Sequence, residues 1–238
     1  MGFLTAIFNT IFYQPLFNAL ILIYTLIPGK DLGIAVILLT ILIRILLYPL
    51  NLKGIRSQKA ISELEPKLKE IRRKFKDDQE SATKAMLELY KKENINPLSE
   101  IFLLFLQLPV LIALYLVFAR SVAMENFNNL YSFVPHPGEI RPFLLMVDLS
   151  KPNLLFAGLS GILQFLQARF QDVKIKTEKN NFSDFSEVFR KQMLYFFPAF
   201  TFFILLKIPS AISLYLIVST GISILQILYV HKKRAGNN

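Results

Sequence analysis

The chain has 238 residues, is 53% hydrophobic, contains no cysteine and carries a formal net charge of +10. Without cysteine it can form no disulfide, no thiol nucleophile and no cysteine-ligated metal site, and we expect no lipid-modified N-terminal cysteine. The apolar residues gather in runs close to the roughly 20 residues of a membrane-spanning helix. The sequence therefore predicts an all-α, multi-pass membrane protein rather than a soluble domain.

Residues 1–29 have no basic stretch ahead of their apolar residues, so we expect no cleaved signal peptide. Apolar side chains recur at helical spacing before Pro15, namely Phe3, Ile7, Phe8, Ile11 and Phe12. This pattern predicts an N-terminal amphipathic helix that lies at the membrane interface. The alternative is a short additional span through Leu16–Ile27.

Five apolar segments are predicted to cross the membrane as a helical bundle. They cover residues 30–50, 99–120, 153–170, 192–208 and 211–230. The third segment scores weakly on hydropathy because it contains Gln164 and Gln167.

The positive charge is unevenly distributed along the chain. Of the 27 Lys and Arg residues, 12 lie in 51–98, six in 169–191 and three in the tail 231–238. These segments alternate with the five spans, so the positive-inside rule places the segment 51–98, the loop 171–191 and the C-terminal tail in the cytoplasm. The loop 121–152 and the N-terminus are then external. Because topology accounts for the charge, we expect no DNA partner.

Segment 51–98 is too polar for the bilayer and is predicted to be a cytoplasmic helical hairpin. Two apolar seams at helical spacing face each other, the first formed by Leu64, Leu68, Ile71 and Phe75 and the second by Ala82, Ala85, Met86 and Leu89. Asp78 is the expected N-cap of the second helix. Pro66 should kink the first helix or lie in its opening turn.

Arg44 lies inside the first apolar run, where a central arginine costs roughly 2.5 to 3.5 kcal/mol on insertion scales. Its side chain should lean toward the N-terminus of its helix, away from the nearby basic segment. No acidic residue lies in any of the five spans, so Arg44 has no intramembrane carboxylate to pair with. An unpaired buried cation requires water or an incoming anion, which predicts a hydrated cavity.

Other polar residues in the spans are candidates to line that cavity. Ser160, Gln164, Gln167 and Gln171 form one stripe on the third span, and the fifth carries Ser213, Ser219, Thr220, Ser223 and Gln226. Interhelical hydrogen bonding is the favoured interpretation of the serines and threonines. For Gln107, Gln164 and Gln167, cavity lining and hydrogen bonding both stay open.

The sequence argues against an enzyme. Gly158-Leu159-Ser160-Gly161 has the form of a nucleophile turn, but the only histidines, His136 and His231, are not expected to reach Ser160. There is no P-loop, dinucleotide fingerprint or HExxH motif. We therefore expect no catalytic residues, no cofactor and no metal.

A series of short motifs gives a specific resemblance through its order and spacing from about Tyr13 to Val230. They are Gln14-Pro15-Leu16-Phe17, Arg44 with Tyr48-Pro49-Leu50, Glu65-Pro66-Lys67, Asn96-Pro97-Leu98, Gln107-Leu108-Pro109, Leu114-Tyr115, Asp148-Leu149-Ser150, Phe197-Pro198, and Pro209-Ser210 with Leu214-Tyr215. The chain resembles the YidC-type membrane protein insertases and their mitochondrial and chloroplast relatives.

The resemblance implies a five-helix bundle around a groove that is open to the cytoplasm and bilayer and closed outside. Arg44 matches the arginine that makes the groove positive in this family, and Gln167 resembles a family glutamine. Spans three and five would form the route to lipid, next to Tyr215. Combined with the polar residues of the spans, the predicted groove residues are Arg44, Gln107, Gln164, Gln167, Ser213 and Tyr215.

The expected function is insertion of nascent membrane proteins by a protein of the bacterial inner membrane. Expected partners are the nascent substrates, the lipid bilayer, and the ribosome or targeting machinery at the hairpin and the loop 171–191. A Sec-type translocon is a further candidate partner. The alternative function is a small anion channel or transporter that uses Arg44 as its selectivity charge.

Overall fold

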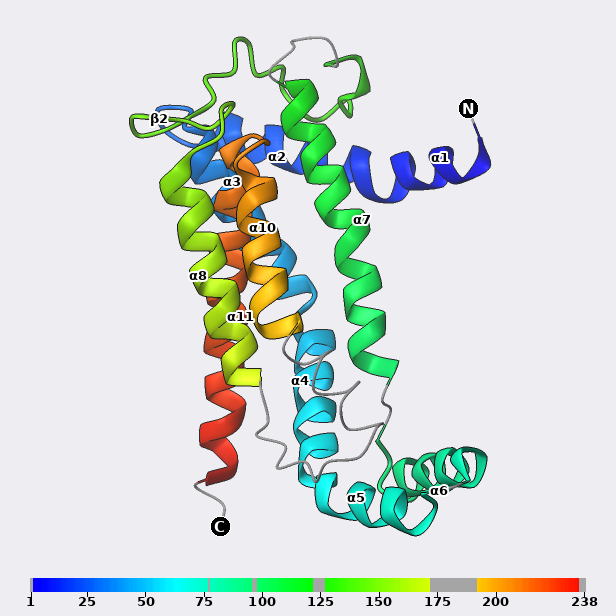
Figure 1. Cartoon of the computed structure of the whole chain (residues 1–238). Coiled ribbons are helices and arrows are strands. Elements are labelled where there is room, and N and C mark those ends of the chain that lie inside the picture. The colour runs from blue at the N-terminus through cyan, green and yellow to red at the C-terminus, as the bar shows by residue number, and fades with distance from the viewer. Residues whose placement is uncertain (1, 77, 96–97, 122–126, 172–191, 236–238) are drawn as a thin grey trace.

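A computed structural model of the chain describes residues 2–76, 78–95, 98–121, 127–171 and 192–235 (Figure 1). These residues are mostly helical. In chain order the elements are α1 (Phe3–Phe8), the π-helix η1 (Asn9–Tyr13), α2 (Gln14–Leu26), α3 (Leu32–Leu46), α4 (Tyr48–Glu63), α5 (Glu65–Lys74), α6 (Gln79–Lys92), α7 (Leu98–Ser121), the short helix η2 (Phe127–Asn129), β1 (Phe143–Leu144), β2 (Val147–Asp148), α8 (Leu154–Gln171), the π-helix η3 (Gln192–Phe196), α10 (Phe197–Leu205) and α11 (Ser210–Ala235).

The N-terminal helix is longer than the sequence pattern predicts. α1, η1 and α2 follow one another without a break, and Pro15, which lacks an N–H, comes directly after the π-helical turn η1. In length and composition, Thr5–Leu26 is able to cross a membrane. In Figure 1, however, α1 runs crosswise to α7, α8 and α11. The interfacial position of this helix stays a prediction.

The first predicted span, residues 30–50, is not one straight helix. α3 ends at Leu46, and α4 continues from Tyr48 at an angle of 62°. Pro49 explains the break, because it lacks an N–H and its ring would clash with the carbonyl four residues earlier. The 15 residues of α3 rise about 22 Å, less than the roughly 30 Å of a hydrocarbon core.

The other predicted spans correspond to helices of unequal length. α7 has 24 residues and α8 has 18, enough for about 36 and 27 Å, whereas η3 with α10 is shorter than a bilayer core. Within the described ranges, length and hydropathy select Thr5–Leu26 and Ser210–Val230, and α3 with α4 if that bent pair counts as one span. The chain thus has two or three candidate spans by this measure, and the five-helix membrane bundle stays a prediction.

α5 and α6 form the hairpin that the two seams predict. Leu68 and Ala82 are buried on the facing sides, while Leu87, off the seam, is 50% exposed. Pro66 lies in the opening turn of α5, and the side chain of Asp78 accepts a hydrogen bond from the Ser81 amide at the start of α6, so both predictions are confirmed. An ion pair between Lys67 and Glu93, 2.8 Å long, ties the two helices together.

We expect Asp78→Ala to loosen the first turn of α6, whereas Asp78→Asn should keep its cap. The Asp78 carboxylate accepts hydrogen bonds from both the amide and the hydroxyl of Ser81, and the hydroxyl bond is the main cause of its lowered pKa. A carboxyl whose folded pKa is depressed stabilises the fold above its ordinary value of about 3.9, and this is lost as pH falls through the folded value. Amide hydrogen exchange along α6 against pH checks this. Equal protection of the Ala and Asn variants would contradict it.

The connections low in positive charge meet at one end of the molecule. The Ser210 amide donates to the Lys151 carbonyl, and the Ala211 amide donates to the Leu149 carbonyl. The Lys30 ammonium donates to the Pro137 carbonyl at 3.4 Å. The hairpin α5–α6 and the C-terminal end of α11 lie at the opposite end (Figure 1). This arrangement is the one expected if the basic segments share one side of a membrane. The rest of the predicted loop 171–191, beyond Gln171, lies outside the described residues.

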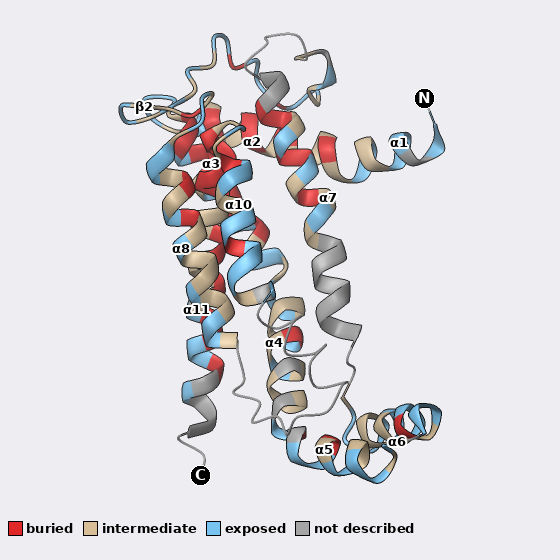
Figure 2. Cartoon of the chain, in the orientation of Figure 1, coloured by how far each residue is buried: buried red, intermediate tan, exposed pale blue. Residues whose placement is uncertain are grey.

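The apolar core fills the loop end of the molecule, as Figure 2 shows. Its largest fully buried members include Phe17, Leu20, Ile21, Tyr24, Leu32, Leu39, Leu114, Leu149, Leu205 and Tyr215. On α3 this core ends at Ile43, and on α11 it ends at Tyr215. The fully buried part of this core therefore ends in the last turn of α3 and in the second turn of α11.

Candidate functional site

Arg44 lies in the last turn of α3, at the edge of the apolar core. Its Nε and Nη2 both donate to the hydroxyl of Ser219 on α11, with an Nε–Oγ distance of 2.9 Å. Among the described residues no ion pair includes Arg44. The guanidinium is half-buried and keeps its positive charge opposite a neutral partner.

Tyr215 and Gln107 extend this contact to α7. The side-chain nitrogen of Gln107 donates a hydrogen bond to the hydroxyl of Tyr215, and Tyr215 is only 1% exposed. Because Tyr215 and Ser219 are one helical turn apart, they share one face of α11. Arg44, Gln107, Tyr215 and Ser219, which we call the Arg44 cluster, thus join α3, α7 and α11.

The Arg44 cluster marks the boundary between two parts of the molecule. Ile43 and Tyr215 are the last core residues of α3 and α11, and Val110, one turn after Gln107, is the first described core residue of α7. The loop side of the cluster is therefore closed by packed apolar side chains. Arg44 also lies near the C-terminal carbonyls of α3, a position that favours a cation.

The polar stripe of α11 continues from the cluster toward the hairpin end. The hydroxyl of Ser223 donates to the Ser219 carbonyl at 3.1 Å, and Gln226 follows on the same face. Gln226 is 8% exposed, and its side-chain oxygen has no hydrogen-bond partner among the described residues. The same holds for the buried side-chain nitrogen of Asn51 on α4. Leaving such groups unpaired costs about 1 to 3 kcal/mol each, so they are places for water.

Ser213 takes no part in the cluster. It is fully buried on α11, and its carbonyl accepts a hydrogen bond from Ser160 of α8 at 3.1 Å. Its own hydroxyl has no hydrogen-bond partner among the described residues. Ser213 also lies about 200° around the helix from Tyr215. The interhelical interpretation therefore fits Ser160, and a groove role for Ser213 stays a prediction.

Gln164 and Gln167 are half-buried on α8. Gln164 lies one turn after Ser160 and so continues the side of α8 that contacts α11. Neither glutamine is hydrogen-bonded to the Arg44 cluster in the described part of the chain. The structure therefore brings together Arg44, Gln107 and Tyr215 from the predicted set and leaves Gln164, Gln167 and Ser213 apart from them.

Ser219 is not among the implied groove residues, although the sequence places it among the polar residues of the fifth span. Its hydrogen bond with Arg44 joins two helices, as the favoured interpretation of the serines predicts. Its position four residues after Tyr215 was the available signal, because that spacing puts it on the same face as a motif residue. Gln226 was a candidate for lining the cavity but is not among the implied groove residues, and no sequence pattern indicated Asn51.

No catalytic arrangement surrounds Ser160 in the described residues. Its hydroxyl donates to the carbonyls of Phe156 and Ser213. The ring of His136 instead packs on Phe127 in the loop before β1, with 4.6 Å between the ring centroids. The described residues contain no group of three or more His, Asp or Glu residues that could hold a metal ion.

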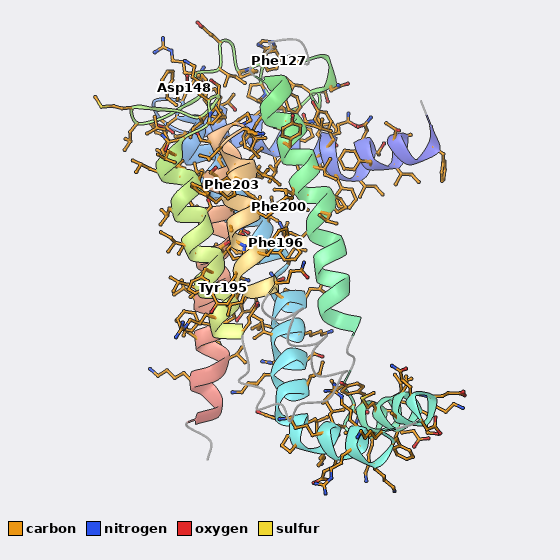
Figure 3. The ribbon with its side chains drawn as sticks, viewed as in Figure 1. Phe127, Asp148, Tyr195, Phe196, Phe200 and Phe203 are labelled. Carbon is orange, nitrogen blue, oxygen red and sulfur yellow. The ribbon has the colours of Figure 1, made fainter. Side chains whose placement is uncertain are left out.

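Several helices carry rows of exposed apolar residues. Figure 3 labels four aromatic residues of this kind, Tyr195 and Phe196 in η3 and Phe200 and Phe203 in α10. Phe196 and Phe200 stack with their ring centroids 5.5 Å apart, and Phe203 is 63% exposed. Such a row is expected where a helix faces hydrocarbon rather than water.

Comparison with known proteins gives a consistent result. A sequence model of the family described as 60Kd inner membrane protein matches residues 22–237. The membrane protein insertase YidC of Anaeromyxobacter dehalogenans (strain 2CP-C) is 32% identical over 210 residues, which cover 87% of this chain and 34% of that protein. The protein of the same name from Wolinella succinogenes is 30% identical over 227 residues, covering 94% of this chain and 38% of the relative.

A third relative, membrane protein insertase YidC of Clostridium tetani (strain Massachusetts / E88), is 33% identical over 147 residues, covering 62% of this chain and 60% of that protein. The chain thus spans about a third of the length of the first two relatives.

Proposed function

The chain belongs to the 60Kd inner membrane protein family, and on this premise we propose that it inserts nascent membrane proteins into the bacterial inner membrane without enzymatic chemistry. The relatives named as insertases support this activity, and the apolar helices support the membrane location. Because the chain spans only about a third of the first relatives, its activity, substrates and partners are all part of the proposal.

The observation that carries the mechanism is the neutral partner of Arg44. A guanidinium held by the Ser219 hydroxyl keeps a net positive charge at the edge of the apolar core. A carboxylate in the external tail of a substrate could replace the hydroxyl and form a charge-assisted pair. Arg44 would then act as a transient counter-charge that lowers the cost of bringing an acidic tail partway across the membrane.

Water would enter the groove from the hairpin end. Ser223, Gln226 and Asn51 supply polar groups on that side, and two of them have buried atoms that lack a partner in the described part of the chain. On the other side, the packed core around Tyr24 and Tyr215 excludes water. This asymmetry supports a groove that is open to the cytoplasm and closed outside, and it argues against a continuous anion pore.

The apolar segment of the substrate would leave sideways into lipid. α8 and α11 present exposed apolar side chains along the proposed route, namely Leu159, Ile162 and Leu166 on α8 and Leu225 and Leu228 on α11. The segment gains roughly 25 cal/mol for each Å² of apolar surface removed from water, and this gain drives the step. No nucleotide is needed.

The hairpin α5–α6 would receive the substrate. Arg73, Lys74 and Lys76 are exposed on it and can contact ribosomal RNA or targeting machinery. The five-span topology, the cytoplasmic side of the hairpin and a contact with a Sec-type translocon belong to the same proposal.

Reconstitution tests the function. The purified chain in liposomes should insert a short single-span substrate with an acidic external tail, and protein-free liposomes should not. A matched substrate with an amide tail (Asp and Glu replaced by Asn and Gln) should depend less on the protein. Protease protection of the tail is the readout. Equal protection of the tail in both kinds of liposome would refute an autonomous insertase.

A further inference from the structure

The turn between β1 and β2 presents two apolar side chains that are almost fully exposed. Phe143 pairs with Asp148 and Leu144 with Val147, so the two-residue turn is Leu145-Met146. Leu145 is 84% exposed and Met146 is 96% exposed. In Figure 1 this hairpin lies at the loop end of the helices and projects sideways from them.

The residues of this turn are contrary to local preference. Leu145 has a φ of 53°, in the left-handed region that glycine and asparagine adopt and that a branched side chain rarely adopts. Two-residue hairpin turns in water favour Asn-Gly or Asp-Gly for this reason. Here Leu145 adopts this strained backbone conformation, and the turn exposes a leucine and a methionine. Strained backbone conformations of this kind occur mostly at functional sites, which suggests that the two apolar side chains contact an apolar environment.

The hairpin is fixed to the start of α3. One oxygen of the Asp31 carboxylate caps α3 by accepting from the Ile34 amide at 2.9 Å. The other oxygen accepts from the Leu145 amide at 3.1 Å. Leu144 packs against Gly33 so closely that a Cβ at this glycine would overlap it. The turn is therefore held at a defined height, level with the first turn of α3.

The exposed apolar surface of α3 continues to this turn. Ile34, Leu38 and Leu42 follow one another at four-residue spacing and are 38 to 43% exposed, which makes them one outward-facing row. Ile34 and Leu145 bind opposite oxygens of one carboxylate, so the row begins beside the turn. In a membrane protein such a row faces lipid, and the turn extends it at the external boundary.

We infer that the β1–β2 turn is a lipid anchor, in which Leu145 and Met146 insert into the interfacial region of the external leaflet. Apolar side chains of this kind reach roughly 5 to 10 Å into the boundary between headgroups and acyl chains. The anchor fixes the height of the external loop and, through Asp31 and Gly33, the height of α3, which carries Arg44. This inference needs only that the chain lies in a membrane and does not depend on insertase activity.

Site-specific labelling tests the anchor, because the chain contains no cysteine and a single introduced thiol is unique. Met146→Cys changes a side chain that makes almost no contact with the protein, so the fold should be unaffected. The variants Leu38→Cys, in the lipid-facing row, and Ser132→Cys, exposed in the same external loop, serve as the lipid and water references. All three are purified and reconstituted without any other protein.

We expect a charged, water-soluble maleimide to react with Met146→Cys much more slowly than with Ser132→Cys. An environment-sensitive fluorophore at Met146→Cys should show blue-shifted emission, as at Leu38→Cys, and should be quenched by nitroxides placed high on the lipid acyl chains. Fast maleimide reaction with no lipid quenching would place the tip in water. That result would overturn the lipid anchor and would point to a protein partner for the turn.

Discussion

Arg44→Ala should lower insertion of a substrate with an acidic external tail by at least about tenfold. The substitution removes the charge that a substrate carboxylate would meet at the edge of the apolar core. Two unit charges about 4 Å apart attract by about 4 kcal/mol at an effective dielectric constant of about 20. Each 1.4 kcal/mol is a factor of about ten in an equilibrium, so even a pair largely screened by water gives this effect.

The comparison with Arg44→Lys separates charge from geometry. Lysine keeps the positive charge but lacks the planar fork that lets Arg44 donate two hydrogen bonds to Ser219. If charge carries the mechanism, the Lys variant should insert the acidic substrate nearly as well as the unaltered protein. Protease protection in liposomes, with tails of zero, one and two carboxylates, is the measurement. Unchanged insertion by Arg44→Ala would make this arginine structural and leave hydration and the lipid route to explain the activity.

Most of the helices could be predicted from the sequence, because apolar runs and helix-capping residues are recognised from neighbouring residues alone. Asp78 caps α6, and Pro66 opens α5, as their positions relative to the seams predict. The division of α3 from α4 depends on Pro49, which lies inside a run that hydropathy treats as continuous. The sequence pattern ends the N-terminal helix before Pro15, whereas the structure continues it through a π-helical turn that no local residue preference predicts.

The site was readable only in part, because side chains that meet across helices leave no spacing signal. The charge of Arg44 in an apolar run and the motifs around Gln107 and Tyr215 make these residues candidates without a structure. The contact of Arg44 with Ser219 joins residues 175 positions apart, which no local pattern reveals. The β1–β2 turn was missed as well, since Leu145-Met146 contradicts the residue preferences by which such turns are recognised.

Ser219→Asp should remove most of the difference in insertion between substrates with acidic tails and substrates with neutral tails. Arg44 itself is unchanged in this variant. The new carboxylate would lie where the Ser219 hydroxyl now accepts two hydrogen bonds from the guanidinium, and it would form a permanent ion pair there. A substrate carboxylate would then have to compete with an internal one that pays no entropy of association. We expect a loss of insertion about as large as that of Arg44→Ala, since the cluster becomes neutral in both variants.

Ser219→Asn is the matched control, because asparagine has the size and shape of aspartate but no charge. It should keep most of the insertion activity, since its side-chain oxygen can still accept from Arg44. Thermal unfolding in detergent should show Ser219→Asp at least as stable as Ser219→Asn, which would exclude misfolding as the cause of lost activity. If the Asp and Asn variants insert the acidic substrate equally well, the net charge of the Arg44 cluster is irrelevant to insertion. Of these two variants, the counter-charge mechanism requires only Ser219→Asp to lose insertion. Only that variant neutralises the charge of Arg44 before the substrate arrives.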